Sequence, residues 1–179
     1  MRTGLIAGLA AAAFATAAFA ATPTVPDVST LNPAALKALI PANIPWTAAA
    51  GLGSTETAVL VGDPNKPGFY VVLNRFHPGT FSHPHYHPND RYIMVISGTW
   101  WVGTGTNWDP EHVTVPMKPG TFVTHYGRHV HYDGARTGEP DAVVMIFGEG
   151  PGTRTDCTGP KAETGPGPCA DAFAAAGKR

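Results

Sequence analysis

The sequence is poor in charged residues. Of its 179 residues, 12 are Lys or Arg and 13 are Asp or Glu, so only 14% carry a charge and the formal net charge is −1. A nucleic-acid-binding surface needs Lys and Arg clustered on one face, which this small and balanced set does not supply. The same balance gives no electrostatic attraction to anionic lipid. We therefore expect neither nucleic acid nor a membrane surface as a partner.

Several catalytic motifs are also missing. The sequence contains no G-x-S-x-G, no Gly-rich Walker loop and no H-E-x-x-H. These absences exclude the serine hydrolase elbow, the phosphate-binding loop and the helical metalloprotease site.

A single long uncharged stretch lies at the N-terminus. Arg2 is followed by residues 4–19 without any charge, and Ala18, Phe19 and Ala20 form a small-x-small signal before Ala21. This is the three-part pattern of a secretory signal peptide. A membrane anchor is the alternative, but the stretch is Ala-rich and falls short of the ~20 strongly apolar residues of a span. We expect cleavage after Ala20 and a secreted or periplasmic protein that does not contact the membrane afterwards.

The sequence has only two cysteines, Cys157 and Cys169, both in the C-terminal tail. Eleven residues separate them, which excludes a catalytic C-x-x-C pair. In an exported protein such a pair is typical of a structural disulfide. We expect a Cys157–Cys169 bond that holds the tail.

Turn-forming residues are abundant, with 21 Gly and 18 Pro. After the signal peptide (1–20), we expect an N-terminal extension over 21–55 with a short helix over 34–40, capped by Asn32 and ended by Pro41. Residues 149–179 form a Gly/Pro-rich tail. Between them, 56–148 contain short segments rich in β-branched and aromatic residues, at 57–61, 69–76, 91–97, 99–103, 113–115, 121–125, 129–132 and 142–147. This pattern predicts a single all-β domain, a sandwich or barrel.

The histidines are concentrated in one part of the chain. All eight fall within 55 residues: His77, His83, His85, His87, His112, His125, His129 and His131. Because alternate residues of a strand point to one face, His83, His85 and His87 are expected to share a face. With a further histidine from a neighbouring strand, such a set favours a transition-metal site over the alternative of a polar strand edge.

The spacing around these histidines resembles the cupin family. The first cupin motif is Gly, five residues, H-x-H, three or four residues, Glu, six residues, Gly. Gly79, His85, His87 and Gly98 match it, and Arg91 stands in the Glu position.

The second cupin motif is Gly, five residues, Pro, one residue, Gly, two residues, His, three residues, Asn. Gly120 and His131 match it, while Tyr126, Arg128 and Ala135 replace the Pro, Gly and Asn. The resemblance covers 56–148 and implies an antiparallel jelly-roll barrel with a metal near its mouth, bound by His85, His87 and His131.

Arg91 departs from the family pattern, since a guanidinium cannot be a ligand and is repelled by a cation. Three arrangements are open. The Pro88–Asn89 pair breaks the alternation and turns Asp90 inward; or Arg91 lies inward and pairs with a carboxylate; or Arg91 holds an anionic substrate group beside the metal.

Three groups of residues around the site remain candidates. His83, His125 and His129 are candidates for an extra ligand or for contacts with a ligand. Trp100 and Trp101 occupy consecutive strand positions, so one is expected inside and the other outside. They are interpreted as core or dimer packing, with substrate contact as the alternative, and Arg91 is the third substrate-binding candidate.

A three-histidine site leaves coordination positions for water, dioxygen or a substrate. All-imidazole ligation suits one Cu, Zn, Fe or Ni ion better than Mg or Ca, and Mn stays open. We favour a metal-dependent oxidoreductase, of oxidase or dioxygenase type, acting on a small or saccharide-derived molecule. The alternatives are a redox-neutral isomerase, lyase or hydrolase, and a non-catalytic metal- or ligand-binding protein. A homodimer is expected from the exposed strand edges and the cupin resemblance.

Overall fold

The computed structural model describes residues 27–49 and 55–177. The chain divides into two compact units, Met1–Asn43 and Ile44–Arg179. The expected signal peptide and its cleavage site lie outside the described residues. Among the residues that are described, no helix has the length and apolarity needed to cross a membrane.

The helix expected over 34–40 is wrong. Asn32 does cap a turn, because its Oδ1 accepts a hydrogen bond from the Ala34 amide at 3.0 Å and its carbonyl accepts one from Leu36 at 3.2 Å. The turn does not continue, and the helical element of this unit is the 3₁₀ helix η1 (Pro41–Asn43). A helix much shorter than ~12 residues needs packing to be stable, and Leu36 and Leu39 are exposed.

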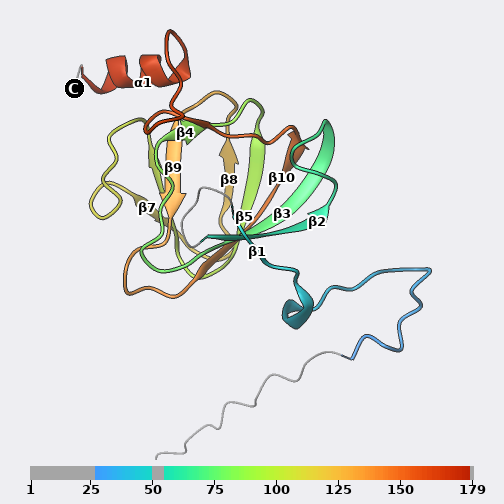
Figure 1. The fold of residues 1–179 in the computed structure, drawn as a ribbon. Coiled ribbons are helices and arrows are strands. Elements are labelled where there is room, and N and C mark those ends of the chain that lie inside the picture. Colours follow the sequence, from blue (N-terminus) through green and yellow to red (C-terminus); the bar gives the residue numbers. More distant parts are fainter. Residues whose placement is uncertain (1–26, 50–54, 178–179) are drawn as a thin grey trace, which may run out of the picture. The chain divides into compact units, whose positions relative to one another are not determined.

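The second unit consists of antiparallel strands in two sheets (Figure 1). The larger sheet has the order β1-β2-β3-β10-β5-β8 and the smaller one the order β11-β4-β9-β6-β7. Along the chain the strands are β1 (Thr47–Ala48), β2 (Glu56–Val61), β3 (Gly68–Phe76), β4 (His85–Tyr86), β5 (Arg91–Ser97), β6 (Trp100–Thr104), β7 (Val115–Met117), β8 (Phe122–His125), β9 (His131–Gly134), β10 (Ala142–Gly150) and β11 (Thr155–Asp156). Six of the eight predicted strands are present with shifts of up to three residues at their ends. The predictions over 113–115 and 129–132 are two residues too early, because β7 and β9 begin at Val115 and His131. Strands β1, β4 and β11 are additional.

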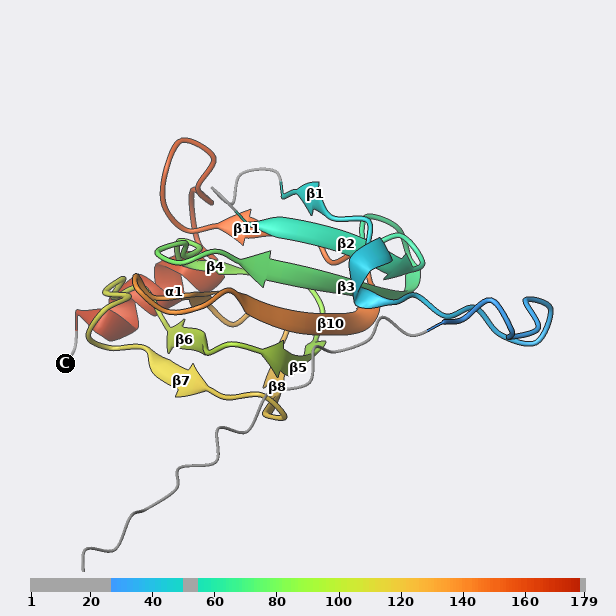
Figure 2. The ribbon, with the colours of Figure 1, turned by 90° about the horizontal axis from the view of Figure 1, so that it is seen from below.

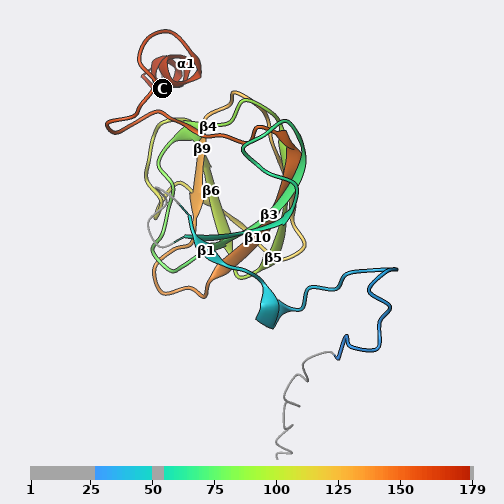
Figure 3. The same cartoon turned by 45° about the vertical axis from the view of Figure 1, so that its right-hand side comes forward.

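The two sheets face each other. Figure 2 shows β2, β3, β10 and β5 side by side in the larger sheet, and Figure 3 shows β9 and β6 of the smaller sheet opposite β3 and β10. Strict alternation along β10, where every second residue from Ala142 to Gly148 is buried, places one face of the strand on the core. The jelly-roll arrangement that the sequence predicts is therefore present as two sheets, which do not join into one continuous cylinder.

The core lies between the sheets. Trp100 is fully buried in it, together with residues such as Ile93 and Val144. Trp101 points the other way and lies under the guanidinium of Arg136, 3.6 Å from its ring centroid. The expected alternation of the two tryptophans is confirmed, and both have structural contacts.

A second, smaller apolar cluster ties the tail to the sheet. It contains Tyr86, Val130, Cys157 and Cys169, and the predicted Cys157–Cys169 disulfide is present. The tail also forms the helix α1 (Pro168–Ala176), which the sequence analysis did not anticipate. Strand β11 pairs with β4, so the tail becomes the edge of the smaller sheet.

Candidate metal centre

Three buried histidines converge where β4 meets β9. His85 in β4 lies directly opposite His131 in β9, and His87 follows β4. The candidate ligand atoms of the three side chains all lie within 4.8 Å of one another. The strand alternation from which the cluster was predicted therefore holds for His85 and His87, although β4 is only two residues long.

The outer nitrogen of each ring is fixed by a backbone carbonyl. His85 Nδ1 donates to His83 O at 2.7 Å, His131 Nδ1 to His129 O at 3.0 Å, and His87 Nδ1 to Thr153 O at 2.9 Å. A carbonyl oxygen only accepts, so each Nδ1 carries the proton and each Nε2 keeps its lone pair. This is how proteins orient histidines that bind a metal.

The Nε2 atoms differ in their contacts within the protein: His131 Nε2 has one long contact, with Arg91 Nη2 at 3.4 Å. His87 Nε2 is buried without a hydrogen-bond partner. Buried polar atoms are rarely left unsatisfied without a functional reason. The described residues at this position therefore suit a metal ion held by three imidazoles.

Burial keeps these imidazoles neutral. It lowers the pKa of His85 and His87 well below the ordinary value and that of His131 to about 3, with the positive charge of Arg91 as the next cause for His87 and His131. A neutral imidazole is the form that binds a metal. The cluster is thus ready to bind a cation at any physiological pH.

We expect the metal-free protein to lose stability as the pH falls below about 6.5. The folded-state pKa of His131, about 3, lies below its ordinary value of 6.5, so the unfolded chain binds the extra proton over this range. His131 alone contributes a loss of about 2 kcal/mol between pH 7 and pH 5. Urea unfolding in the presence of EDTA at pH 7 and pH 5, compared between wild type and His131→Gln, measures the contribution of His131 to the loss of unfolding free energy. An equal pH dependence in the two proteins would contradict it.

His125 differs from the three histidines in its hydrogen bonding. Arg91 Nη2 lies 3.3 Å from His125 Nδ1, and because arginine only donates, this nitrogen is the acceptor. The proton is then on His125 Nε2, which is buried without a partner. His125, His131 and Asp133 also form a group with ligand spacing, but Arg91 lies against two of its nitrogens. His125 therefore lies beside the cluster and supports Arg91.

Arg91 points inward. It is 8% exposed, and its Nη2 lies 3.4 Å from His131 Nε2. Asp90 is exposed and its Oδ1 accepts a hydrogen bond from the Gly127 amide at 2.7 Å, so the arrangement that turns Asp90 inward is wrong. The guanidinium makes its two hydrogen bonds to histidines rather than to a carboxylate, and its Nε has no hydrogen-bond partner.

The other candidate residues do not join the cluster. His83 is exposed and stacks on Trp108, with ring centroids 4.4 Å apart. His129 is exposed, although its carbonyl orients His131. Trp100 and Trp101 are absent from the lining of the adjacent cavity.

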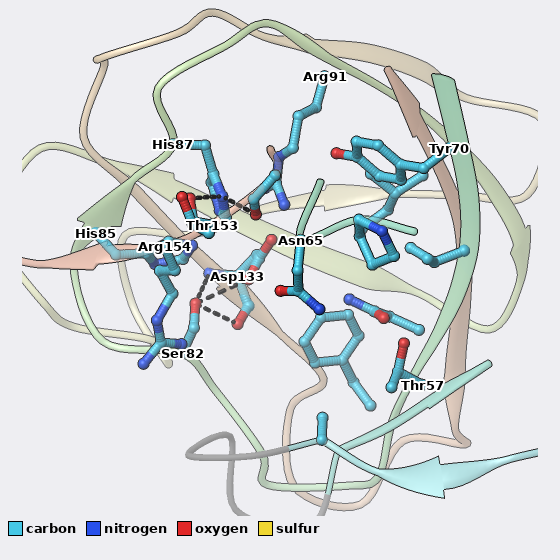
Figure 4. A pocket seen from close by; sticks show the side chains of 17 residues that line it. Thr57, Asn65, Tyr70, Ser82, His85, His87, Arg91, Asp133, Thr153 and Arg154 are labelled. Carbon is cyan, nitrogen blue, oxygen red and sulfur yellow. Dashed lines mark hydrogen bonds between the residues drawn. The ribbon is translucent and has the colours of Figure 1, made fainter. Parts of the chain in front are cut away.

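A cavity of about 350 Å³ opens beside the histidines (Figure 4). Its polar lining was mostly missed by the sequence analysis and comprises Thr57, Asn65, Tyr70, Asn74, Ser82, Asp133, Thr153 and Arg154, next to His85, His87 and Arg91. The alternation signal was present for some of these residues. Asp133 is two residues from His131, and Asn74 interrupts an otherwise apolar strand face that includes Tyr70, Val72 and Phe76.

The C-terminal tail completes the site. The carbonyls of Gly152 and Thr153 both accept from His87 Nδ1, at 3.0 and 2.9 Å. The tail is held by the β11–β4 pairing, by a hydrogen bond from the Cys157 amide to Pro84 O at 2.9 Å, and by the disulfide. The orientation of one candidate ligand therefore depends on a segment 65 residues further along the chain.

We expect the double variant Cys157→Ala/Cys169→Ala to be less stable and to bind zinc more weakly. Opening a loop of this size lowers the free energy of unfolding by about 3 kcal/mol. A loosened tail also frees the His87 ring, and loss of such an orienting contact weakens metal binding by about 10- to 100-fold. Urea unfolding and competitive zinc titration measure the two effects, with reduced wild type as the parallel sample. Unchanged zinc affinity would show that the tail holds His87 without the disulfide.

Comparison with protein-family models and with curated proteins finds no match for this sequence. Solved structures do match. The polyketide cyclase RemF of Streptomyces resistomycificus is similar over 75% of this chain and 90% of its own, with 15% identity and a TM-score of 0.55. A cupin-2 domain protein of Rhodospirillum rubrum is similar over 70% of this chain and 82% of its own, with 17% identity and a TM-score of 0.53. The chain has the cupin fold.

A chain from the structures of the DMSP lyases RdDddP and RnDddQII is a further match, with 17% identity and a TM-score of 0.50 over 65% of this chain and 63% of that one. Within the cupin fold, the motif glycine Gly98 has φ +70°, and a Cβ there would overlap the carbonyl oxygen of Asp141. Glycine at this motif position is therefore required by the backbone.

Proposed function

We propose that this protein is a metal-dependent enzyme that binds one transition-metal ion through His85, His87 and His131 and acts on a small organic molecule. The observation that carries the proposal is the convergence of three imidazoles whose Nδ1 atoms are fixed by carbonyls, with His87 Nε2 left unpartnered. The adjoining cavity of about 350 Å³ favours an enzyme over a purely structural metal site, because it offers room for a substrate.

The charges around the site favour redox-neutral chemistry. When bound, the ion would supply Lewis acidity to a substrate oxygen. The three imidazoles add no negative charge, and Arg91 adds a positive one beside them. Such a site stabilises negative charge that develops on a substrate, while oxidation of the ion would place a further positive charge next to a buried guanidinium. A lyase, isomerase or cyclase type of reaction is therefore our first choice.

Other polar groups of this chain line the same cavity. Burial raises the pKa of the Tyr70 phenol, which therefore keeps its proton at neutral pH and can donate it to a bound molecule. The carboxyl of Asp133 accepts a hydrogen bond from the Ser82 hydroxyl at 2.8 Å. The fold of two neighbours, a polyketide cyclase and a DMSP lyase chain, supports a small-molecule reaction without net oxidation.

The first test is metal content followed by oxygen consumption. Protein dialysed against zinc is expected to retain close to one ion per chain, and failure to retain any would overturn the proposal. The sequence-based preference for an oxidase or dioxygenase stays a prediction. Oxygen uptake by iron- or copper-loaded protein with oxidisable organic molecules, above the rate of the free ion, would favour it over redox-neutral chemistry.

Export and dimer formation also stay predictions. We propose that the protein works in an oxidising compartment, for which the Cys157–Cys169 disulfide is the supporting observation. N-terminal sequencing of the protein recovered from culture medium or periplasm tests cleavage after Ala20. Light scattering of the mature chain tests the expected homodimer.

A further inference from the structure

Two arginines line one cavity, and each has one buried donor atom without a hydrogen-bond partner. Arg91, from β5, is buried and its Nε has no hydrogen-bond partner. Its Nη2 contacts are long, at 3.3 and 3.4 Å, and both go to neutral imidazoles. The carboxyl of Asp133 attracts this buried guanidinium, but the hydrogen bonds of Arg91 go to the two imidazoles rather than to that carboxyl. The guanidinium therefore keeps donors that can bind a further anion.

The second guanidinium comes from the tail. Arg154 directly follows Thr153, whose carbonyl holds His87, and it lines the same cavity (Figure 4). Its Nε lies 2.7 Å from Asp156 Oδ1, while its Nη1 is buried without a partner. One side of this arginine is therefore neutralised and the other remains free to donate.

The charges around the cavity favour an anion once a cation is bound at the histidines. The ionisable side chains that line it within the described residues are Tyr70, His85, His87, Arg91, Asp133 and Arg154. The histidines are neutral, and Arg154 is paired with Asp156. Asp133 is the one carboxyl on the lining. Burial raises its pKa, the charges of Arg91 and Arg154 oppose that shift, and its Oδ1 accepts a hydrogen bond from the Ser82 hydroxyl at 2.8 Å. A cation bound by the histidines would make the net charge around the cavity more positive.

The donor geometry selects a carboxylate. A guanidinium presents parallel N–H groups that match the two oxygens of a planar carboxylate. Arg91 Nη2 lies 3.4 Å from His131 Nε2, so a carboxylate on Arg91 is next to the three candidate ligands. Val72, Phe76 and Ile146 supply apolar lining for a short carbon skeleton.

We propose that this cavity is a binding site for a small organic acid whose carboxylate is held by Arg91 and Arg154, with an adjacent carbonyl or hydroxyl oxygen directed to the metal position. The placement of the second oxygen rests on the proposed function. The carboxylate subsite stands on the two arginines alone.

The test is calorimetric titration with pyruvate and with its neutral amide, pyruvamide, on zinc-loaded and on zinc-free protein. Zinc-loaded wild type is expected to bind pyruvate at least about tenfold more tightly than pyruvamide, since charge-assisted hydrogen bonds to buried arginine are lost in the amide. Arg91→Gln and Arg154→Gln are each expected to lower pyruvate affinity by about 10- to 100-fold at unchanged zinc content. Lys66→Gln is the matched control, because its exposed ammonium is paired with Asp63 outside the cavity.

The outcomes separate the two proposals. Equal affinity for pyruvate and pyruvamide in zinc-loaded protein would overturn the carboxylate site and leave the metal-dependent function standing. Absence of zinc binding, together with arginine-dependent pyruvate binding by zinc-free protein, would overturn the function and support the carboxylate site. Should Arg91→Gln fail to fold, as judged by its thermal transition, Arg154→Gln at the edge of the cavity decides: wild-type affinity for pyruvate in that variant would overturn the two-arginine subsite.

Discussion

His131→Ala is expected to abolish stoichiometric zinc binding, with a fall in affinity on the order of 1000-fold. One of three imidazoles is removed, and the Nε2 atoms of His85 and His87 alone do not define a site for a divalent ion. The ring of His131 is also the one that Arg91 approaches at 3.4 Å, so its loss leaves the guanidinium beside the ion position. Competitive titration with a chromogenic zinc chelator measures the change.

His129→Ala is the matched control for this prediction. Its side chain is exposed, and the carbonyl that accepts the His131 Nδ1 hydrogen bond remains in the variant. Zinc affinity should stay within about threefold of wild type, because removal of an exposed group away from the cluster changes little. If His131→Ala kept its zinc, or if His129→Ala lost it to the same degree, the assignment of the three ligands would be wrong.

The histidines whose positions follow from strand alternation and motif spacing were predictable from the sequence. His85 and His87 have strand spacing, and His131 falls on the second cupin motif, so alternation and motif spacing together bring them to one place. His83 was grouped with them on the expectation that 83–87 is extended throughout, with alternate side chains on one face. The strand β4 begins at His85, and His83 turns out to stack on Trp108.

The contributions of the tail were not predictable in this way. Gly152, Thr153 and Arg154 reach the site through pairing of β11 with β4, a contact between segments that no local periodicity relates. Their neighbourhood in the sequence is Gly- and Pro-rich, which indicates a loop but not where the loop lies. The two cysteines did predict that the tail is held by a disulfide. The structure adds that this tail carries the Thr153 carbonyl to which His87 Nδ1 donates, so the disulfide helps to fix the His87 ring.

The sequence showed that Arg91 is unusual at its position but did not decide which way its side chain points. Its mismatch with the family glutamate was visible, and strand alternation favoured an inward position for it. Its orientation depends on partners from two other strands, His125 in β8 and His131 in β9. Such a choice is decided by burial and packing across the sheets rather than by the sequence around residue 91.

Arg91→Glu is expected to tighten zinc binding by at least about tenfold and to abolish the preference for pyruvate over pyruvamide. The substitution replaces a positive by a negative charge beside the candidate ligands, where a unit charge at 4 Å and an effective dielectric constant of 20 interacts by about 4 kcal/mol. Solvent and side-chain adjustment reduce this figure, and a tenfold change needs only about 1.4 kcal/mol of it. The same carboxylate repels an organic anion at the position that Arg91 offers to it.

Arg91→Gln separates charge from shape in this experiment. Zinc affinity should rise in the order Arg, Gln, Glu at position 91, while pyruvate affinity should be high only for Arg. Both quantities come from titrations of the same samples, with zinc-free thermal transitions to verify folding. A partly unfolded variant would lose zinc and pyruvate together, so opposite changes in the two affinities cannot arise from loss of structure. Zinc affinity that is the same in all three proteins would show that the charge at position 91 does not act on the ion, and with it the electrostatic argument for redox-neutral chemistry would fail.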